Sequence, residues 1–507
     1  MAEEDNYHNS FEKNDARVAE SLSSSRVSSP DQDVLDEREE KRILRKVDLH
    51  LLIPLWFLFL IGFMDRINLG NVRLLGLEKD LHLKGNQFNI ALQVFFVTYI
   101  LFDIPVNILL KRSRPSYLIS GMAFCWGIAS LAQGFVKNHA ALVACRLLLG
   151  IFEAGFTPGA TYLMSMYYKR HEFQLRFNIF WTAGVIAGAV AGLLAYGLVN
   201  MGGLGGLAGW RWVLIIEGLM ACVLSMITAF TLADWPKQAR FLTPAQRDLW
   251  QKRTTNDVGG QAKMDKLTLS TFLRVIKDWK IWCGAFMYLT VGTSGYSTSL
   301  FIPSILSTLG YTGVESQVQS IPVWVVATVA CFAVGVLSDR VKHRYGFIIF
   351  GLLFAMIGYA ILIAQGPLPK PGGPPMGLPV RVRYMAVFFV VTGTYIAQPV
   401  VIVWLSNNLG GSYKRGIGSA IQICFGNFSG IIASNIFVAK SAPRYFSGYG
   451  TVMGLLFLCG LLSTVFAFGL MRENKKRDRG ERDHLLQLSE EEQQNLGDDH
   501  PTFRFTM

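Results

Sequence analysis

An arginine and a glutamate stand in the middle of a long apolar segment of this chain. The segment runs from about Ala140 to Met166 and contains Arg146 and Glu153. Such a run can cross a bilayer as a helix, and a spacing of two helical turns places both side chains on one face. A charge facing lipid costs roughly 2.5 to 3.5 kcal/mol or more at a helix centre. Both groups must therefore face protein or water, as in a functional site; an ion pair that only joins two helices is the alternative.

A second acid and base, Asp65 and Arg66, lie near the end of another apolar segment that begins near Leu49. At about 1.5 Å per helical residue, Asp65 lies roughly 24 Å from that start, in the outer half of a hydrocarbon core about 30 Å thick. The two pairs of charges overlap approximately in depth, which is compatible with one shared cavity. A hydrated helix end at the outer interface would also account for Asp65 and Arg66.

The second half of the chain offers uncharged hydrogen-bonding groups in place of buried charges. Its apolar segments carry Tyr296, Gln422 and Asn427. Uncharged donors and acceptors of this kind suit the orientation of a small ligand. Hydrogen bonds that bridge neighbouring helices are the alternative role for each of them.

The composition places these residues in a membrane domain. The 507 residues are 51% apolar and 17% charged, against about 25% charged in soluble proteins, and the mean hydropathy is +0.33. We predict an all-α polytopic membrane protein with twelve transmembrane helices in two pseudo-symmetric six-helix bundles. The expected spans cover about 49–71, 88–110, 116–135, 139–166, 174–200, 211–233, 281–309, 318–338, 345–365, 383–405, 416–439 and 449–471.

The distribution of positive charge predicts the orientation of these helices. Lysine and arginine are concentrated in alternate loops, in the central linker and next to both outermost spans. The side that carries them is expected to be cytoplasmic. The net charge of +12 is therefore mostly a topology signal, and nucleic-acid binding is not expected.

The expected regions are a disordered acidic, serine-rich tail with a basic juxtamembrane segment (1–46), an N-terminal six-helix bundle (47–233), a cytoplasmic linker (234–280), a C-terminal six-helix bundle (281–471) and a cytoplasmic tail (472–507). The last region contains Glu481-Arg-Asp-His-Leu-Leu486, which matches an acidic dileucine sorting pattern. A match this short also arises by chance in a charged tail.

Enzymatic and metal-dependent functions lack the residues they need. All seven cysteines lie inside apolar segments, which argues against a disulfide framework and against a CxxC metal site. No nucleophile, metal-ligand set or acid-base cluster stands out beyond the charges described above. We expect neither an enzyme nor a bound cofactor.

The two halves of the chain echo one another where their second helix ends in a basic turn. In this respect the chain resembles the major facilitator superfamily, whose loop signature GxxxDRxxxR is complete at Gly335, Asp339, Arg340 and Arg344. The resemblance implies a gating role for these residues and two halves that rock about a central site. The first copy of the signature departs from the pattern.

Four features restrict the resemblance to one family within this superfamily. They are Asp65-Arg66-x-Asn68, the stretch from Arg146 to Gly159, the block from Gly209 to Gly218, and the complete loop signature. Together they are similar to the anion:cation symporter family, especially its fungal branch of allantoate, nicotinate and pantothenate permeases. The resemblance covers residues 43 to 472 and implies proton-driven uptake of a small organic anion.

The resemblance also implies roles for individual residues. Asp65 and Glu153 would be the proton-titrating carboxylates, and Arg146 would hold Glu153 ionised until a proton replaces it. Arg66 would bind the substrate carboxylate, and Tyr99 would face the substrate.

The predicted protein is thus a secondary active transporter that takes up a carboxylate such as nicotinate, pantothenate or allantoate together with protons. We expect a monomer in the plasma membrane with both termini cytoplasmic; a vacuolar or endosomal membrane is the alternative location. An exporter of an acidic metabolite and a nutrient-sensing receptor, both of the same fold, are the alternative functions.

Overall fold

A computed structural model describes residues 37–257, 269–311, 313–341, 343–365, 377–437, 444–489, 492–493 and 496–507. The predicted disordered tail lies outside these residues up to position 36. The basic juxtamembrane segment that follows it is helical and leads directly into the first membrane helix. The described part of the chain contains helices and no β-strand.

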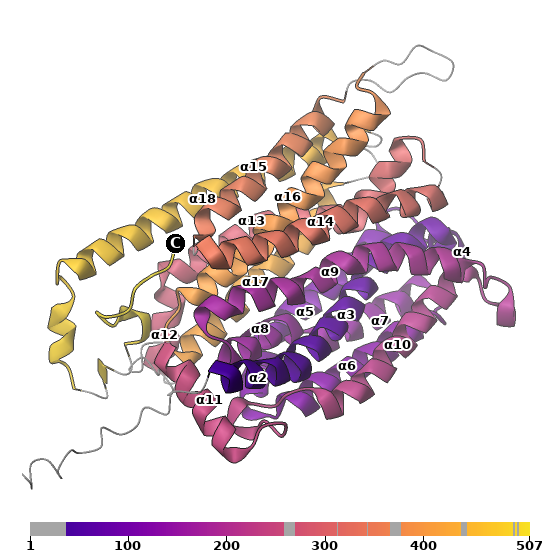
Figure 1. Cartoon of the computed structure of the whole chain (residues 1–507). Helices are drawn as coiled ribbons and strands as arrows, with labels where there is room; N and C mark the ends of the chain where they lie inside the picture. Colours follow the sequence, from indigo (N-terminus) through magenta and orange to yellow (C-terminus); the bar gives the residue numbers. More distant parts are fainter. Residues whose placement is uncertain are drawn as a thin grey trace, which may run out of the picture.

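The first half of the chain forms six long helical spans, drawn from indigo to magenta in Figure 1. The first is continuous from α2 through η1 into α3, and the fourth is divided into α7 and α8. The elements are α2 (Glu37–Val47), η1 (Asp48–Leu52), α3 (Ile53–Val72), η2 (Arg73–Leu77), α4 (Glu78–Asp80), α5 (Gln87–Arg112), α6 (Pro115–Gln133), α7 (His139–Glu153), α8 (Phe156–Tyr167), α9 (Arg170–Val199), η3 (Leu204–Gly206) and α10 (Gly209–Thr231).

The second half repeats this arrangement with six further long helices, drawn from rose through orange to yellow in Figure 1. A linker with three short helices joins the two halves. The linker holds η4 (Pro236–Gln238), α11 (Pro244–Asp257) and α12 (Leu269–Lys277). The long helices and the elements after them are α13 (Trp279–Thr308), α14 (Gly313–Val341), α15 (Arg344–Ile363), α16 (Val380–Asn407), α17 (Ser412–Ile436), α18 (Phe446–Asp478), η6 (Asp483–Gln487) and η7 (Gly497–Asp499).

These helices confirm the predicted fold class and the number of spans. Eleven of the described helical segments are long and apolar enough to cross a membrane. The twelfth long helix, α13, has 30 residues and packs among them against α17, α18 and α16. We call the end of the bundle where the α5–α6 and α14–α15 turns and the end of α18 lie the basic end.

The two halves meet along two pairs of helices, α9 with α14 and α5 with α17. Small residues allow the first pair to pack closely. The Cα of Gly188 on α9 faces the indole ring of Trp324, and the Cα of Gly335 on α14 faces the amide of Asn178. A β-carbon at either glycine would overlap its neighbour. Gly188 in the fifth span therefore has a packing role.

The fourth span is broken directly after Glu153. Gly155 adopts a φ of +73°, a conformation that favours glycine, and separates α7 from α8. Its backbone N–H donates to the Oδ1 of Asp103 on α5 at 3.0 Å. A side chain at Gly155 would also overlap Val106. Asp103, inside the second span, therefore anchors the break next to Glu153.

The linker helix α11 ties the start of the first span to the start of the fifth. Arg253 donates to the carboxylates of Glu40 on α2 and Glu172 on α9. The indole N–H of Trp250, also on α11, donates to the backbone oxygen of Tyr167 at 3.0 Å. The buried Trp250 side chain fills the space between these helices. Helix α11 is therefore packed into the N-terminal half at the basic end.

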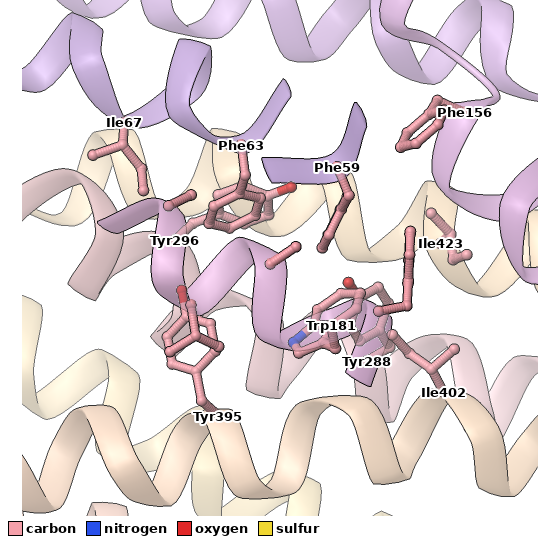
Figure 2. Close-up of a cluster of buried hydrophobic side chains, with 14 of the residues drawn as sticks. Phe59, Phe63, Ile67, Phe156, Trp181, Tyr288, Tyr296, Tyr395, Ile402 and Ile423 are labelled. Atoms are coloured by element: carbon pink, nitrogen blue, oxygen red, sulfur yellow. The ribbon is translucent and has the colours of Figure 1, made fainter. Parts of the chain in front are cut away.

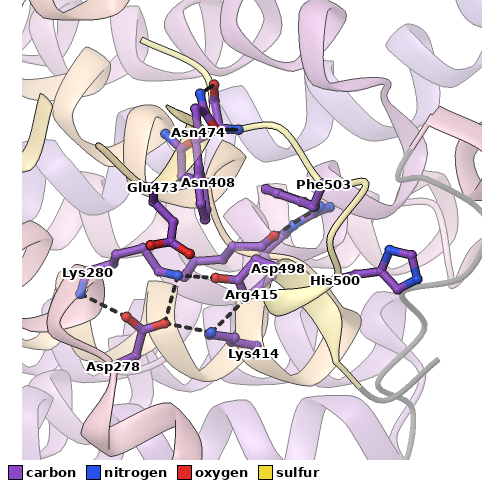
Figure 3. Close-up of polar contacts among 12 residues, drawn as sticks. Asp278, Lys280, Asn408, Lys414, Arg415, Glu473, Asn474, Asp498, His500 and Phe503 are labelled. Carbon is purple, nitrogen blue, oxygen red and sulfur yellow. Dashed lines mark hydrogen bonds and ion pairs between the residues drawn. The ribbon is translucent and has the colours of Figure 1, made fainter. Parts of the chain in front are cut away.

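Residues 496–507, predicted only as part of a tail, pack against the C-terminal half at its basic end. The buried Asp498 carboxylate forms ion pairs with Lys280 and with Lys414, the latter at 2.6 Å, and both lysines also pair with Asp278 (Figure 3). Arg477 on α18 donates to the backbone oxygen of Asp498 at 2.8 Å. This segment thus joins α13, α17 and α18.

Further backbone contacts hold the same segment. The indole of Trp404 and the amide of Asn408 donate to the backbone oxygen of Thr506 at 2.9 and 3.0 Å. Asn474 on α18 exchanges two hydrogen bonds with the backbone of Phe505. Four helices of the C-terminal half are therefore connected by one short stretch of chain.

The Asp498 pairs persist over the physiological pH range. Burial alone would raise the pKa of the Asp498 carboxyl, but Lys280 and Lys414 outweigh it and lower this pKa to about 2. Because the pKa in the folded protein is below that of the unfolded chain, about 3.9, the pairs contribute stability above about pH 4. That contribution is lost only as the pH falls through about 2.

We predict that Asp498→Asn releases residues 496–507 and leaves two buried ammonium groups short of a counter-ion. Removing one partner of a buried pair costs about 3 to 5 kcal/mol. The expected result is faster cleavage after Arg504 by trypsin and a lower thermal unfolding temperature. Asp478→Asn, which removes a carboxylate from an exposed pair with Arg504, is the control and is expected to change stability by less than about 1 kcal/mol. Equal effects of the two variants would contradict the prediction.

Candidate functional site

Arg66 forms the central ion pair of the molecule with Glu153. The guanidinium donates from Nε to Glu153 Oε1 at 2.7 Å, and its Nη2 lies 2.5 Å from the same oxygen. Both side chains are buried in the middle of the bundle. Gly62 leaves room for this approach, because a β-carbon there would make a tight contact of 3.3 Å with Glu153 Oε1. The second carboxylate oxygen of Glu153 has no hydrogen-bond donor among the described residues.

Aromatic rings surround the guanidinium of Arg66. Its central carbon lies 4.9 Å from the ring centroid of Tyr99, 5.4 Å from that of Phe95 and 6.0 Å from that of Phe63. Cation–π contact with these faces stabilises a cation that water does not solvate. A planar or apolar ligand next to Arg66 would meet the same rings.

Tyr296 connects the charged half to the uncharged half. Arg66 Nη1 donates to the hydroxyl of Tyr296 on α13 at 2.8 Å, and this hydroxyl donates to Asn427 Oδ1 on α17 at 2.9 Å. Each of the three side chains comes from a different helix. The hydrogen-bonded chain from Glu153 to Asn427 therefore spans the interface between the two bundles.

Two small cavities flank this chain of hydrogen bonds. One is lined by Arg66, Tyr296 and Asn427 with Trp181 and Gln398, and the other by Arg66, Arg146 and Tyr296 with apolar side chains. Each has a volume of about 10 Å³, which is room for about one water molecule. Figure 2 shows how aromatic side chains from both halves, among them Phe63 and Tyr296, fill the space between. The structure is therefore closed around the site.

Asp65 points away from Arg66, into the N-terminal bundle. Its Oδ1 accepts a hydrogen bond from the hydroxyl of Ser130 on α6 at 2.9 Å, and its Oδ2 has no donor among the described residues. Nearby, Asn68 donates to the carboxylate of Glu217 on α10 and accepts from Asn71 at 2.6 Å. Asp65 and Glu217 are both buried. A second polar cluster thus lies behind the central ion pair.

Arg146 links the two clusters by charge alone. Its Nε and Nη2 are buried and donate no hydrogen bond within the described part of the chain. The charges of Asp65, Glu153 and Glu217 all act on it. Arg66 and Arg146 together can balance only two of these three carboxylates, so the charge state of each carboxylate affects the others.

The structure brings most of the predicted site residues together. Arg66, Glu153, Tyr99, Tyr296 and Asn427 form one contact network, and Asp65 and Arg146 lie directly behind it. The depth estimate from the sequence was therefore sufficient to place the two charged pairs in one region of the bundle.

The partner of Glu153 differs from the expectation, because the ion pair joins Glu153 to Arg66 rather than to Arg146. The physical reason is local. Glu153 is the last residue of α7, and the helix break beyond it and the space beside Gly62 turn its carboxylate toward α3.

Gln422 lies apart from the network. Its amide donates to the backbone oxygens of Gly284 and Val401, both at 3.2 Å, and it is fully buried within the C-terminal half. Gln422 therefore bridges α13, α16 and α17, which was the alternative role considered for it. It lines neither central cavity.

The residues of the loop signature lie at the α14–α15 turn, at the basic end and outside the central network. Arg344 is buried and, with the Asn407 amide oriented to satisfy both groups, donates to the Asn407 oxygen at 2.8 and 3.2 Å. Arg340 is exposed, and the side chain of Asp339 lies outside the described residues. A gating role for these residues remains a prediction.

Sequence reasoning gave too little weight to Glu217 and Asp103. Glu217 shares a buried cluster with Asp65 and Arg146. Asp103 accepts a hydrogen bond from the Gly155 N–H. Both are carboxylates inside predicted spans, and the cost of burying such a group was the signal that could have marked them.

Comparison with known proteins identifies the family. The model of the Major Facilitator Superfamily matches residues 55–468. The chain belongs to this superfamily. This facilitator is similar to curated fungal transporters over most of its length, in agreement with the predicted fungal branch, and its relatives are transporters rather than enzymes.

Three curated relatives illustrate the similarity. The high-affinity nicotinic acid transporter of Saccharomyces cerevisiae is 31% identical over 470 residues, covering 92% of this chain and 85% of the relative. An MFS-type transporter of Penicillium expansum is 32% identical over 491 residues, covering 94% and 92%. An uncharacterized transporter of Schizosaccharomyces pombe is 33% identical over 448 residues, covering 88% and 86%.

Solved structures support the same fold. The proton:xylose symporter XylE superposes on this facilitator with a TM-score of 0.63 at 15% identity, covering 83% of this chain and 95% of the solved one. A bacterial homologue of the human lysosomal transporter Spinster gives a TM-score of 0.56 at 17% identity, covering 83% and 96%. At these identities the likeness concerns the arrangement of helices alone.

We predict that Asp103→Ala destabilises the break between α7 and α8, because it leaves the buried Gly155 N–H without an acceptor. The expected loss is about 1 to 3 kcal/mol. Asp103→Asn retains an amide oxygen in the same position and is expected to recover most of the thermal stability. Thermal unfolding of the purified protein measures both variants. Equal unfolding temperatures for alanine and wild type would refute the anchoring role.

Proposed function

We propose that this facilitator carries a small organic anion across the membrane together with protons, by alternating access. The observation that carries the proposal is the buried ion pair of Arg66 with Glu153, bridged to the other half of the molecule through Tyr296. Once Glu153 is neutralised, the guanidinium of Arg66 has no counter-ion and can bind a substrate carboxylate. Tyr296 and Asn427 come from the opposite bundle and can orient the same ligand.

The proposed coupling is an exchange of partners at Arg66. When Glu153 is ionised it occupies the guanidinium, and the site has no vacant charge for a carboxylate. A proton on the free oxygen of Glu153 neutralises it, and the substrate carboxylate then replaces it at Nε and Nη2 of Arg66. Net charge in the closed site is the same before and after, so neither exchange leaves an uncompensated buried charge.

Asp65 provides a second proton position in this proposal. Its Oδ2 has no donor, and it shares the field of Arg146 with Glu153 and Glu217. A substrate anion that enters with one proton at Glu153 carries no net charge across the membrane. A second proton makes the entering charge positive, so that an inside-negative potential favours entry. The gain is about 2.3 kcal/mol per charge at 100 mV.

The substrate class follows from what surrounds Arg66. One guanidinium, two hydroxyl or amide groups and several aromatic rings suit a single carboxylate on a flat or apolar body. The nicotinic acid transporter among the relatives supports a substrate such as nicotinate, with pantothenate and allantoate as the other members of the proposed class. We further propose a monomer in the plasma membrane with the basic end in the cytoplasm.

We predict that Glu153→Gln abolishes pH-driven accumulation while leaving the substrate site open. Arg66 then lacks its internal partner permanently, so substrate binding should become independent of pH. Counterflow of radiolabelled nicotinate in proteoliposomes should persist, whereas uptake driven by an imposed pH gradient should fall to the level of empty liposomes. Concentrative uptake at the wild-type rate would exclude Glu153 from coupling.

Asp65→Asn tests the second carboxylate separately. We expect loss of accumulation with counterflow retained, because Asp65 does not contact Arg66. Ser130→Ala, which removes only the hydrogen bond to Asp65, is the matched control and should shift the pH dependence of uptake without abolishing it. If Asp65→Asn accumulates substrate normally, a single proton at Glu153 is sufficient.

Arg66→Lys tests recognition. Lysine keeps the charge but cannot donate two hydrogen bonds to one carboxylate in the geometry of a guanidinium. We expect at least about a tenfold loss of apparent affinity for the anion, about 1.4 kcal/mol, with Arg66→Ala inactive. Unchanged affinity in both variants would remove Arg66 from the binding site. Uptake of nicotinate, pantothenate and allantoate is compared in vesicles of known orientation. This comparison also reports the direction of transport.

A further inference from the structure

A large cavity lies at the basic end of the C-terminal half, away from the transport site. It has a volume of about 910 Å³ and is bounded by α12, the ends of α13 and α18, and the packed segment 496–507. This volume is in the range of ligand-binding pockets, about 300 to 1,000 Å³. The central ion pair and its two small cavities share no residue with it.

The charge of this cavity is strongly positive. Its lining carries eight lysine and arginine side chains against three carboxylates. Four of these cations are used within the protein, because Lys280 and Lys414 pair with Asp278 and Asp498, and Arg477 and Arg482 with Glu473. Lys277, Arg472 and Lys476 form no ion pair within the described part of the chain. The cavity therefore has uncompensated positive charge that can bind an anion.

One wall of the cavity belongs to the membrane interface. The apolar run of α18 ends at Met471, and Arg472 follows it directly. Trp279 packs on Gly469 of the same helix and is 45% exposed, as is Leu273 on α12. Half-exposed tryptophan marks the level of the lipid headgroups. An occupant of the cavity would thus meet basic groups on one side and an apolar, lipid-facing surface on the other.

We propose that this cavity binds the phosphorylated headgroup of an anionic phospholipid of the adjacent leaflet. A lipid satisfies both walls at once, since its phosphates meet Lys277, Arg472 and Lys476 while its acyl chains lie along Trp279 and α18. Clusters of basic residues beside a membrane helix bind such headgroups electrostatically. A free polyanion would leave the apolar wall without a partner.

The location of the site gives the lipid an effect on the carrier. The cavity is lined by Phe505 and Asp499 of the packed segment, whose neighbour Asp498 joins α13 and α17 through their lysines. Further along the same two helices, α13 carries Tyr296 and α17 carries Asn427. A headgroup in the cavity would therefore stabilise the contacts that connect these helices at the basic end.

The experiment compares binding to two probes and three variants of the full-length purified protein. The probes are fluorescent dioctanoyl phosphatidylinositol bisphosphate and the matching soluble inositol phosphate without acyl chains. Arg472→Gln with Lys476→Gln removes two cavity charges, and Lys475→Gln with Arg479→Gln removes two charges from exposed positions of the same helix end that do not line the cavity. Arg472→Lys with Lys476→Arg retains the charge.

We expect the cavity variant to bind the lipid at least about tenfold more weakly, and the other two variants to bind like wild type. The soluble headgroup should bind more weakly than the lipid. Equal losses in the cavity variant and the exposed variant would show general attraction to a basic surface and overturn the proposal. Equal affinity for the two probes would overturn it as well, in favour of a soluble polyanion. Unchanged thermal unfolding of the variants excludes misfolding as the cause.

Discussion

A guanidinium buried between two helical bundles requires a counter-ion, and this requirement organises the centre of the molecule. Arg66 is 7% exposed and has one internal carboxylate, Glu153, together with a tyrosine hydroxyl and three aromatic rings. Breaking such a pair without a replacement leaves a desolvated charge, which costs several kcal/mol. The site can therefore exchange one anion for another far more readily than it can stand vacant. Gly62, the break after Glu153 and the position of Tyr296 all serve this one contact.

The fold was largely predictable from the chain, for a simple physical reason. Twelve apolar runs of membrane length leave few alternatives, because a lipid environment requires each backbone polar group to be satisfied within a helix. The fourth span shows the limit of that argument. Hydropathy describes one run from about 140 to 166, whereas the structure divides it at Gly155. A single glycine in a left-handed conformation has no signature in a hydropathy profile.

The candidate site was predictable in its membership and less so in its pairing. A charge inside a span is costly enough to mark Asp65, Arg66, Arg146 and Glu153 individually. Which carboxylate meets which arginine depends on how α3 and α7 are rotated about their axes, and a hydropathy profile does not report that rotation. Gln422 illustrates the same limit, since a buried amide satisfies backbone oxygens as well as it would a ligand.

The break between α7 and α8 also has a mechanical consequence. A continuous helix transmits a tilt along its whole length and must lose hydrogen bonds to bend. A span divided at Gly155 already contains a pivot, and the Gly155 N–H is bonded to Asp103 instead of to the helix. Glu153 is the last residue on one arm of that pivot, and Asp103 holds the backbone N–H of Gly155 directly before the other arm. Under the proposed coupling, a proton gained or lost at Glu153 would act at the end of one arm, where two half-spans can change their angle without unwinding.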